Sequence, residues 1–142
     1  MKHHYLAVCA MLLSVNAGAA SLITESEARL PEVSGATSRS ITRGPGIKVI
    51  SPDPAAVIKS PFNLKLAFEP RGGAKIVAES VKMTYLKVPA VDLLDRIRPG
   101  ISEQGIDLAN AEAPPGEHRI QMSVEDSEGR RTTTVIKLSV VK

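Results

Sequence analysis

The chain has 142 residues, a formal net charge of +3, 3% aromatic residues and no tryptophan. This length fits a single domain. Proteins that read single-stranded nucleic acid stack the bases on aromatic side chains beside a basic groove, so the composition argues against a nucleic-acid partner.

The first twenty residues are typical of a cleaved secretory signal peptide. A basic start at Lys2 precedes the apolar run "YLAVCAMLLSV", and "NAGAA" supplies the small residues before a cleavage site. The run is shorter than the roughly 20 residues that span a bilayer, so we expect no transmembrane anchor after cleavage. Cys9, the single cysteine, lies inside this run, so the mature chain has no thiol for a disulfide, a metal or catalysis. The sequence therefore predicts a periplasmic or secreted protein.

Residues 21–45 are predicted to be a flexible leader. Small, polar and charged residues dominate, and apolar residues follow neither the strand nor the helix period. The stretch "ITESEARL" is compatible with one or two helical turns, which Pro31 would end. We expect the leader to be dispensable for folding, with a pro-segment or a partner-binding tail as alternatives.

From residue 46 onward the apolar residues recur at every second position, as in half-buried strands. Strands are predicted at "IKVIS" (47–51), "FNLKLAFE" (62–69), "SVKMTYLKV" (80–88), "GIDLANA" (105–111), 119–125 and 134–141. The stretch "VDLLDRIRPGI" (91–101) is compatible with a short helix or a ragged strand. The predicted core consists of Phe62, Leu64, Leu66, Phe68, Val81, Met83, Tyr85, Ile120, Met122, Val124, Ile136, Leu138 and Val140.

The segment "DSEG" (126–129) is predicted to be the turn of a closing hairpin. Asp126 can accept backbone N–H bonds at the first position of a turn, and Gly129 can adopt the positive φ of a type I turn with a bulge. The alternative is a Ca²⁺ site, but Glu125, Asp126 and Glu128 lack the alternating spacing of Ca²⁺ ligands. The chemistry of the segment therefore favours a structural turn, and we predict no metal site.

Residues 46–142 resemble bacterial immunoglobulin-like domains. The closing stretch resembles their last hairpin at Pro115, Gly116, His118, Asp126 and Gly129, and "SPDPAAVIKSPFNLKLAFEP" resembles their opening strand. The resemblance implies an all-β, immunoglobulin-like antiparallel β-sandwich of about seven strands, in which Pro115, Gly116, Asp126 and Gly129 shape turns. A copper-binding subgroup shares this opening and binds copper through histidines, one of them at the mature N-terminus. This chain would begin near Ser21 and retains only His118, so we expect no copper.

No catalytic motif stands out, and we predict neither an enzyme nor a cofactor. His118 lies at the head of a strand, where we expect it to be exposed or at a sheet edge. Asp92 and Asp95 could form an acid pair as in glycosidases, but Arg96 and Arg98 beside them favour surface ion pairs.

The sequence thus predicts a non-catalytic binding or structural module that acts on another cell-envelope component. If Arg96, Arg98, Arg130 and Arg131 converge, they form a basic patch for an acidic partner. The expected partner is another envelope protein or an anionic glycan, and a free edge strand offers a second route to binding. A metal or small-ligand carrier and a hydrolase remain the alternatives.

Overall fold

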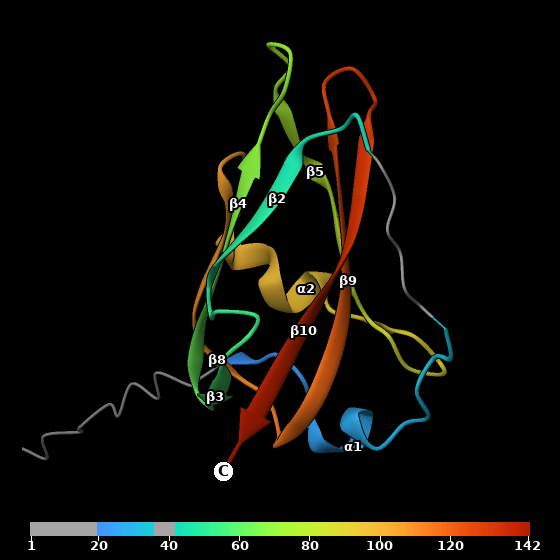
Figure 1. The fold of residues 1–142 in the computed structure, drawn as a ribbon, viewed down its shortest axis with the longest axis vertical. Helices are drawn as coiled ribbons and strands as arrows, with labels where there is room; N and C mark the ends of the chain where they lie inside the picture. The colour runs from blue at the N-terminus through green and yellow to red at the C-terminus, as the bar shows by residue number, and fades with distance from the viewer. Residues whose placement is uncertain (1–19, 36–41) are drawn as a thin grey trace, which may run out of the picture.

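A computed structural model of the chain describes residues 20–35 and 42–142 (Figure 1). The predicted signal peptide lies outside these residues, except for Ala20. The described residues form an all-β sandwich of two sheets. None of the helices in these ranges is long and apolar enough to cross a membrane.

The first sheet has the order β1-β8-β4-β2, and β7 also pairs with β8. Its strands are β1 (Ala20–Ser21), β2 (Gly46–Ser51), β4 (Phe62–Glu69), β7 (Ile101–Ser102) and β8 (Gly105–Glu112). The second sheet has the order β3-β10-β9-β5-β6. Its strands are β3 (Val57–Lys59), β5 (Ile76–Tyr85), β6 (Val91–Asp92), β9 (Gly116–Asp126) and β10 (Arg131–Val141). Within residues 20–35 and 42–142, seven strands are longer than two residues, in agreement with the predicted number, and two pairs, β1–β8 and β3–β10, are parallel.

The alternating sequence pattern places one face of each long strand in the core. In β4, Phe62, Leu64, Leu66 and Phe68 are buried, whereas Asn63, Lys65 and Glu69 are exposed. All thirteen predicted core residues are buried, so the face assignment is confirmed. Strict alternation has this effect because successive strand side chains point to opposite faces of a sheet.

The prediction of a flexible leader is wrong for residues 21–33. β1 pairs with β8, and the amides of Leu22 and Ile23 both donate to Glu112 O at 2.9 and 3.1 Å. The side chains of Leu22 and Ile23 are 0% and 2% exposed and belong to the core. We call residues 20–33 the N-terminal strap. The prediction failed because two adjacent apolar residues show no period, yet they suffice to fill a gap between two sheets.

Two cations attach the N-terminal strap to the sandwich. Arg96 donates through Nη2 to Glu27 Oε1 (2.6 Å) and through Nη1 to Leu22 O (2.9 Å). Lys87 donates to Ala28 O at 3.1 Å, and its ammonium lies 3.4 Å from a Glu32 carboxylate oxygen. Within the strap, α1 (Glu25–Ala28) begins at a capping box formed by Thr24 and Glu27. The strap is therefore an integral part of the fold.

The segment 91–101 is mostly helical, which decides between the two alternatives left open by the sequence. After β6, α2 (Leu94–Ile97) continues into the 3₁₀ helix η1 (Arg98–Gly100). Asp92 Oδ1 accepts from the amide of Leu94 at 2.9 Å, so this carboxylate supports the first turn. Leu93 and Ile97 are fully buried and close one side of the sandwich.

Candidate functional site

The structure corrects the prediction that His118 is exposed or at a sheet edge, because its strand β9 lies between β10 and β5. The side chain lies in the core, and the residue is 2% exposed. Tyr85 Oη lies 2.9 Å from Nδ1, and Nε2 lies 2.7 Å from the carbonyl oxygen of Pro114. Because a carbonyl can only accept, Nε2 carries the proton and Nδ1 accepts from the Tyr85 hydroxyl. Both ring nitrogens are therefore engaged, and the bond to Tyr85 joins β9 to β5.

Burial sets the protonation state of this histidine. Loss of hydration disfavours the imidazolium and lowers the pKa of His118 below its ordinary value, and the nearby Lys87 ammonium acts in the same direction. The Lys87 ammonium lies 5.3 Å from the centre of the Tyr85 ring, within the range of a cation–π contact. Burial also raises the pKa of Tyr85 to about 12. His118 is thus a neutral structural residue at neutral pH.

Asp92 and Asp95, the candidate acid pair, take up local structural contacts. Asp92 Oδ1 accepts from the amide of Leu94, and Asp95 pairs with Arg98 at 2.9 Å. The same segment also carries Arg96, whose guanidinium binds Glu27 of the N-terminal strap. Across the described ranges, no three His, Cys, Asp or Glu side chains are grouped to hold a metal ion.

The four arginines of the predicted basic patch do not form one cluster. Arg96 and Arg98 lie on α2 and η1, beside the middle of the sandwich, whereas the β9–β10 turn carries Arg130 and Arg131 at one end (Figure 1). Each pairs with a carboxylate: Arg96 with Glu27, Arg98 with Asp95, Arg130 with Asp126 and Glu128, and Arg131 with Glu125. Their positive charge is therefore largely neutralised within the chain.

Three segments meet at the end of the sandwich opposite α1, and we call this region the loop end (Figure 1). It consists of residues 42–45, the β4–β5 connection (70–75) and the β9–β10 turn (126–131). The predicted turn is confirmed at its two expected residues. The amide of Gly129 donates to Asp126 O at 3.0 Å, and Gly129 has a φ of +76°.

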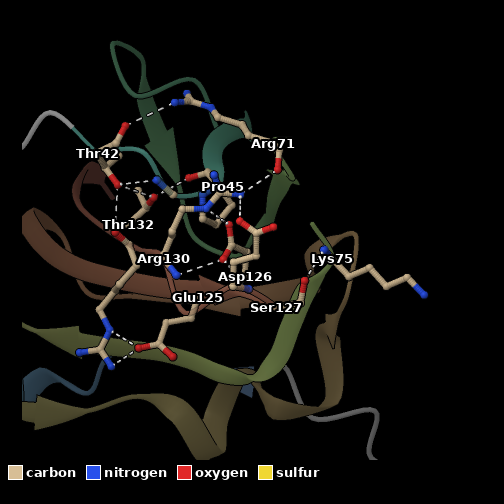
Figure 2. Close-up of polar contacts among 12 residues, drawn as sticks. Thr42, Pro45, Arg71, Lys75, Glu125, Asp126, Ser127, Arg130 and Thr132 are labelled. Carbon is tan, nitrogen blue, oxygen red and sulfur yellow. Dashed lines mark hydrogen bonds and ion pairs between the residues drawn. The ribbon is translucent and has the colours of Figure 1, made fainter. Parts of the chain in front are cut away.

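Asp126 holds the β9–β10 turn together from a buried position (Figure 2). Its Oδ1 accepts from the amides of Glu128 and Arg130, both at 3.0 Å, and its Oδ2 accepts from Arg130 Nε at 2.8 Å. Burial alone would raise the pKa of this carboxyl. The two amides and the Arg130 guanidinium outweigh burial and hold the pKa of Asp126 below its usual value. Asp126 therefore binds the Arg130 side chain in addition to the two backbone amides of the turn.

Further hydrogen bonds join the turn to the other two segments (Figure 2). Arg130 Nη2 donates to the carbonyl of Arg71 at 3.0 Å. Ser127 and Lys75 exchange two bonds: the amide of Ser127 donates to Lys75 O (2.7 Å), and the amide of Lys75 donates to Ser127 Oγ (3.0 Å). The β4–β5 connection is thus fixed against the β9–β10 turn.

The segment 42–45 is fixed to the start of β10. Thr42 Oγ1 donates to Arg131 O at 2.9 Å, and Thr132 Oγ1 donates to Pro45 O at 2.6 Å. A Cβ on Gly44 would lie 2.7 Å from Thr132 Oγ1 and 2.9 Å from the Arg131 carbonyl carbon, so the two backbones approach too closely for any side chain. The expectation of flexibility is therefore wrong here too.

This scaffold displays three cations that the sequence analysis did not select. Arg43, Arg71 and Lys75 are exposed, and none of them pairs with a carboxylate of the described residues. Arg71 and Lys75 flank a turn in which Gly72 and Gly73 have φ values of +62° and +75°. The sequence shows Arg71 and Lys75 on either side of a Gly-Gly turn, so these two cations could have been predicted as a site. Arg43 is distant in sequence, and only tertiary packing brings its segment to the loop end.

No protein family model matches the chain, and no curated protein matches it. A crystal structure of an engineered protein is similar in part, with a TM-score of 0.45 and 13% sequence identity. The similarity covers 69% of this chain and 20% of the engineered protein, so the chain spans about a fifth of that protein's length.

Proposed function

We propose that the protein is an exported, non-catalytic, immunoglobulin-like module that binds an acidic component of the cell envelope through its loop end. The strand order supports the immunoglobulin-like assignment. β2-β4-β8-β7 corresponds to strands A, B, E and D, and β10-β9-β5 corresponds to G, F and C. In this arrangement the β4–β5 and β9–β10 connections occupy the end where immunoglobulin variable domains carry their binding loops. Export rests on the signal-like residues 1–20.

The observation that carries the proposal is the set of exposed cations at the loop end. None of these three cations, Arg43, Arg71 and Lys75, has a carboxylate partner among the described residues. By contrast, Arg130 pairs with two carboxylates and Arg131 pairs with one. Guanidinium groups bind carboxylates, sulfates and phosphates through paired N–H donors. The hydrogen bonds beneath them fix the backbone, so binding would cost little conformational entropy there.

The test is binding of the protein to an anionic polysaccharide, with heparin as the probe, at several salt concentrations. We expect Arg71→Glu/Lys75→Glu to weaken binding at least tenfold and to reduce its salt dependence. The matched control is Lys48→Glu/Lys65→Glu, which makes the same change of charge at exposed positions within β2 and β4, outside the loop end. Equal weakening by both double variants would show that only net charge matters and would contradict the proposal.

A further inference from the structure

The N-terminal strap begins where the signal-like residues end. The sequence has small residues at Gly18 and Ala20, the pattern that precedes a signal-peptidase cut between Ala20 and Ser21. In the structure, Ala20 and Ser21 form β1, which pairs in parallel with Ala111 and Glu112 of β8. The peptide bond expected to be cut therefore lies inside a strand of the folded sandwich.

The two residues that follow β1 are fixed in the sandwich. The amides of Leu22 and Ile23 donate to Glu112 O, and both side chains are buried in the core. The carbonyl of Leu22 also accepts from Arg96 Nη1 at 2.9 Å. Proteases cut exposed segments, and they reach a buried segment only in molecules in which it has locally unfolded. A peptidase can therefore reach the bond before Ser21 only when the strap has left the sandwich.

Other contacts that hold the strap in place lie away from this bond. Arg96 of α2 donates to both carboxylate oxygens of Glu27, at 2.6 and 2.8 Å. Lys87 donates to the carbonyl of Ala28 at 3.1 Å. None of these groups belongs to the small-residue stretch that a signal peptidase recognises. The strap can therefore be loosened by substitutions that leave the cleavage sequence unchanged.

An unpaired acid lies beside the terminus that the cut would create. Glu112 is the register partner of Ser21, and neighbouring strands are about 4.8 Å apart. The Glu112 carboxylate forms no ion pair with a cation of the described residues. A cut before Ser21 creates an α-amino group, which is mostly protonated at neutral pH. The cut thus supplies a positive charge within reach of this carboxylate.

We propose that docking of the N-terminal strap and removal of the export signal exclude one another, so that the signal is cut first and the strap docks afterwards. The cut adds one water molecule across the Ala20–Ser21 peptide bond and yields the carboxylate of Ala20 and the ammonium of Ser21. This ammonium pairs with Glu112 and stabilises the docked strap. The inference rests on the export signal of the proposed function and is independent of the loop-end cations.

The first test is the rate at which a signal peptidase cuts the purified, folded chain of residues 1–142, with a synthetic peptide of residues 1–35 as the undocked reference. We expect the folded chain to be cut at least tenfold more slowly than the peptide. Arg96→Glu, which breaks the ion pair with Glu27, should speed the cut severalfold, and Glu27→Gln should have a smaller effect of the same sign. The matched control is Arg98→Glu, because Arg98 pairs with Asp95 and not with the strap.

Two results of this test would overturn the proposal: a folded chain that is cut as fast as the peptide, and equal acceleration by Arg96→Glu and Arg98→Glu. A peptide that is not cut at all would show that residues 1–20 are no export signal. That result would remove both export and the present inference, whereas heparin binding by the loop end would be unaffected.

The second test concerns the new terminus. The intact mass of the cut protein should correspond to a chain that begins at Ser21. Glu112→Gln should lower the urea midpoint of the cut chain more than that of the uncut chain, because only the cut chain has the ammonium. The matched control is Glu103→Gln, since Glu103 also forms no ion pair with a described cation, and it should affect both chains equally. A different first residue, or equal effects of Glu112→Gln on the two chains, would overturn the pairing of the new terminus.

Discussion

The N-terminal strap provides the most direct test of the fold. Leu22 and Ile23 are 0% and 2% exposed, so truncation of either to alanine leaves a cavity that the sheets cannot readily close. Substitutions of this kind cost about 2–5 kcal/mol each. Since small domains are stable by only about 5–15 kcal/mol, each substitution should remove a large part of the free energy of unfolding.

The measurement is urea-induced unfolding of the wild type, Leu22→Ala, Ile23→Ala and the control Ile50→Ala. Ile50 is 48% exposed, so the control makes the same chemical change as Ile23→Ala with little loss of buried area. We expect the control to cost less than about 1 kcal/mol, in line with the smaller apolar area that it removes from the interior. If Leu22→Ala and Ile23→Ala cost no more than the control, the strap does not pack in the core.

Four further outcomes follow from individual contacts. Glu27→Gln should destabilise the protein at neutral pH, and its difference from the wild type should disappear as pH falls from about 4.5 towards 2, because a hydrogen bond from Arg96 lowers the pKa of Glu27 to about 2. His118 has a pKa lowered by burial, so the unfolded state binds its proton first and the free energy of unfolding should decrease as pH falls below about 6.5; His118→Gln should flatten this slope in urea titrations. Gly129→Val should cost on the order of 1–2 kcal/mol, because its φ of +76° disfavours a β-branched residue, whereas Gly129→Asn should cost less. Asp126→Asn should lower the melting temperature by several degrees, since an amide nitrogen would face either Arg130 Nε or the two backbone amides that the carboxylate now accepts; a change of less than one degree would reduce Asp126 to a turn residue.

The strands that could be read from the sequence are those in which one face is buried and the other is wet. β4 is the clearest case: its predicted limits, Phe62 and Glu69, are those of the structure. The closing hairpin was equally readable, because Asp126 and Gly129 specify a turn by local backbone chemistry. These features depend on residues close together in the chain.

Contacts between distant segments were not readable. His118 looked like an exposed residue at the head of a strand, yet its ring bonds to Tyr85, 33 positions away, and lies in the core. Leu22 and Ile23 looked like part of a loose leader, yet they complete a core whose other residues come from both sheets.

The sequence alone determined the period of the strands, the position of the last turn and the set of apolar residues that forms most of the core. Tertiary structure decided which charges remain available. Arg96, Arg98, Arg130 and Arg131 are neutralised by carboxylates that packing or the local turn brings to them, whereas Arg43, Arg71 and Lys75 are exposed on the segments of the loop end and have no carboxylate partner among the described residues. The physical reason is range: backbone preferences act over a few residues, but the pairing of a charge depends on every segment that folding brings within a few ångströms of it.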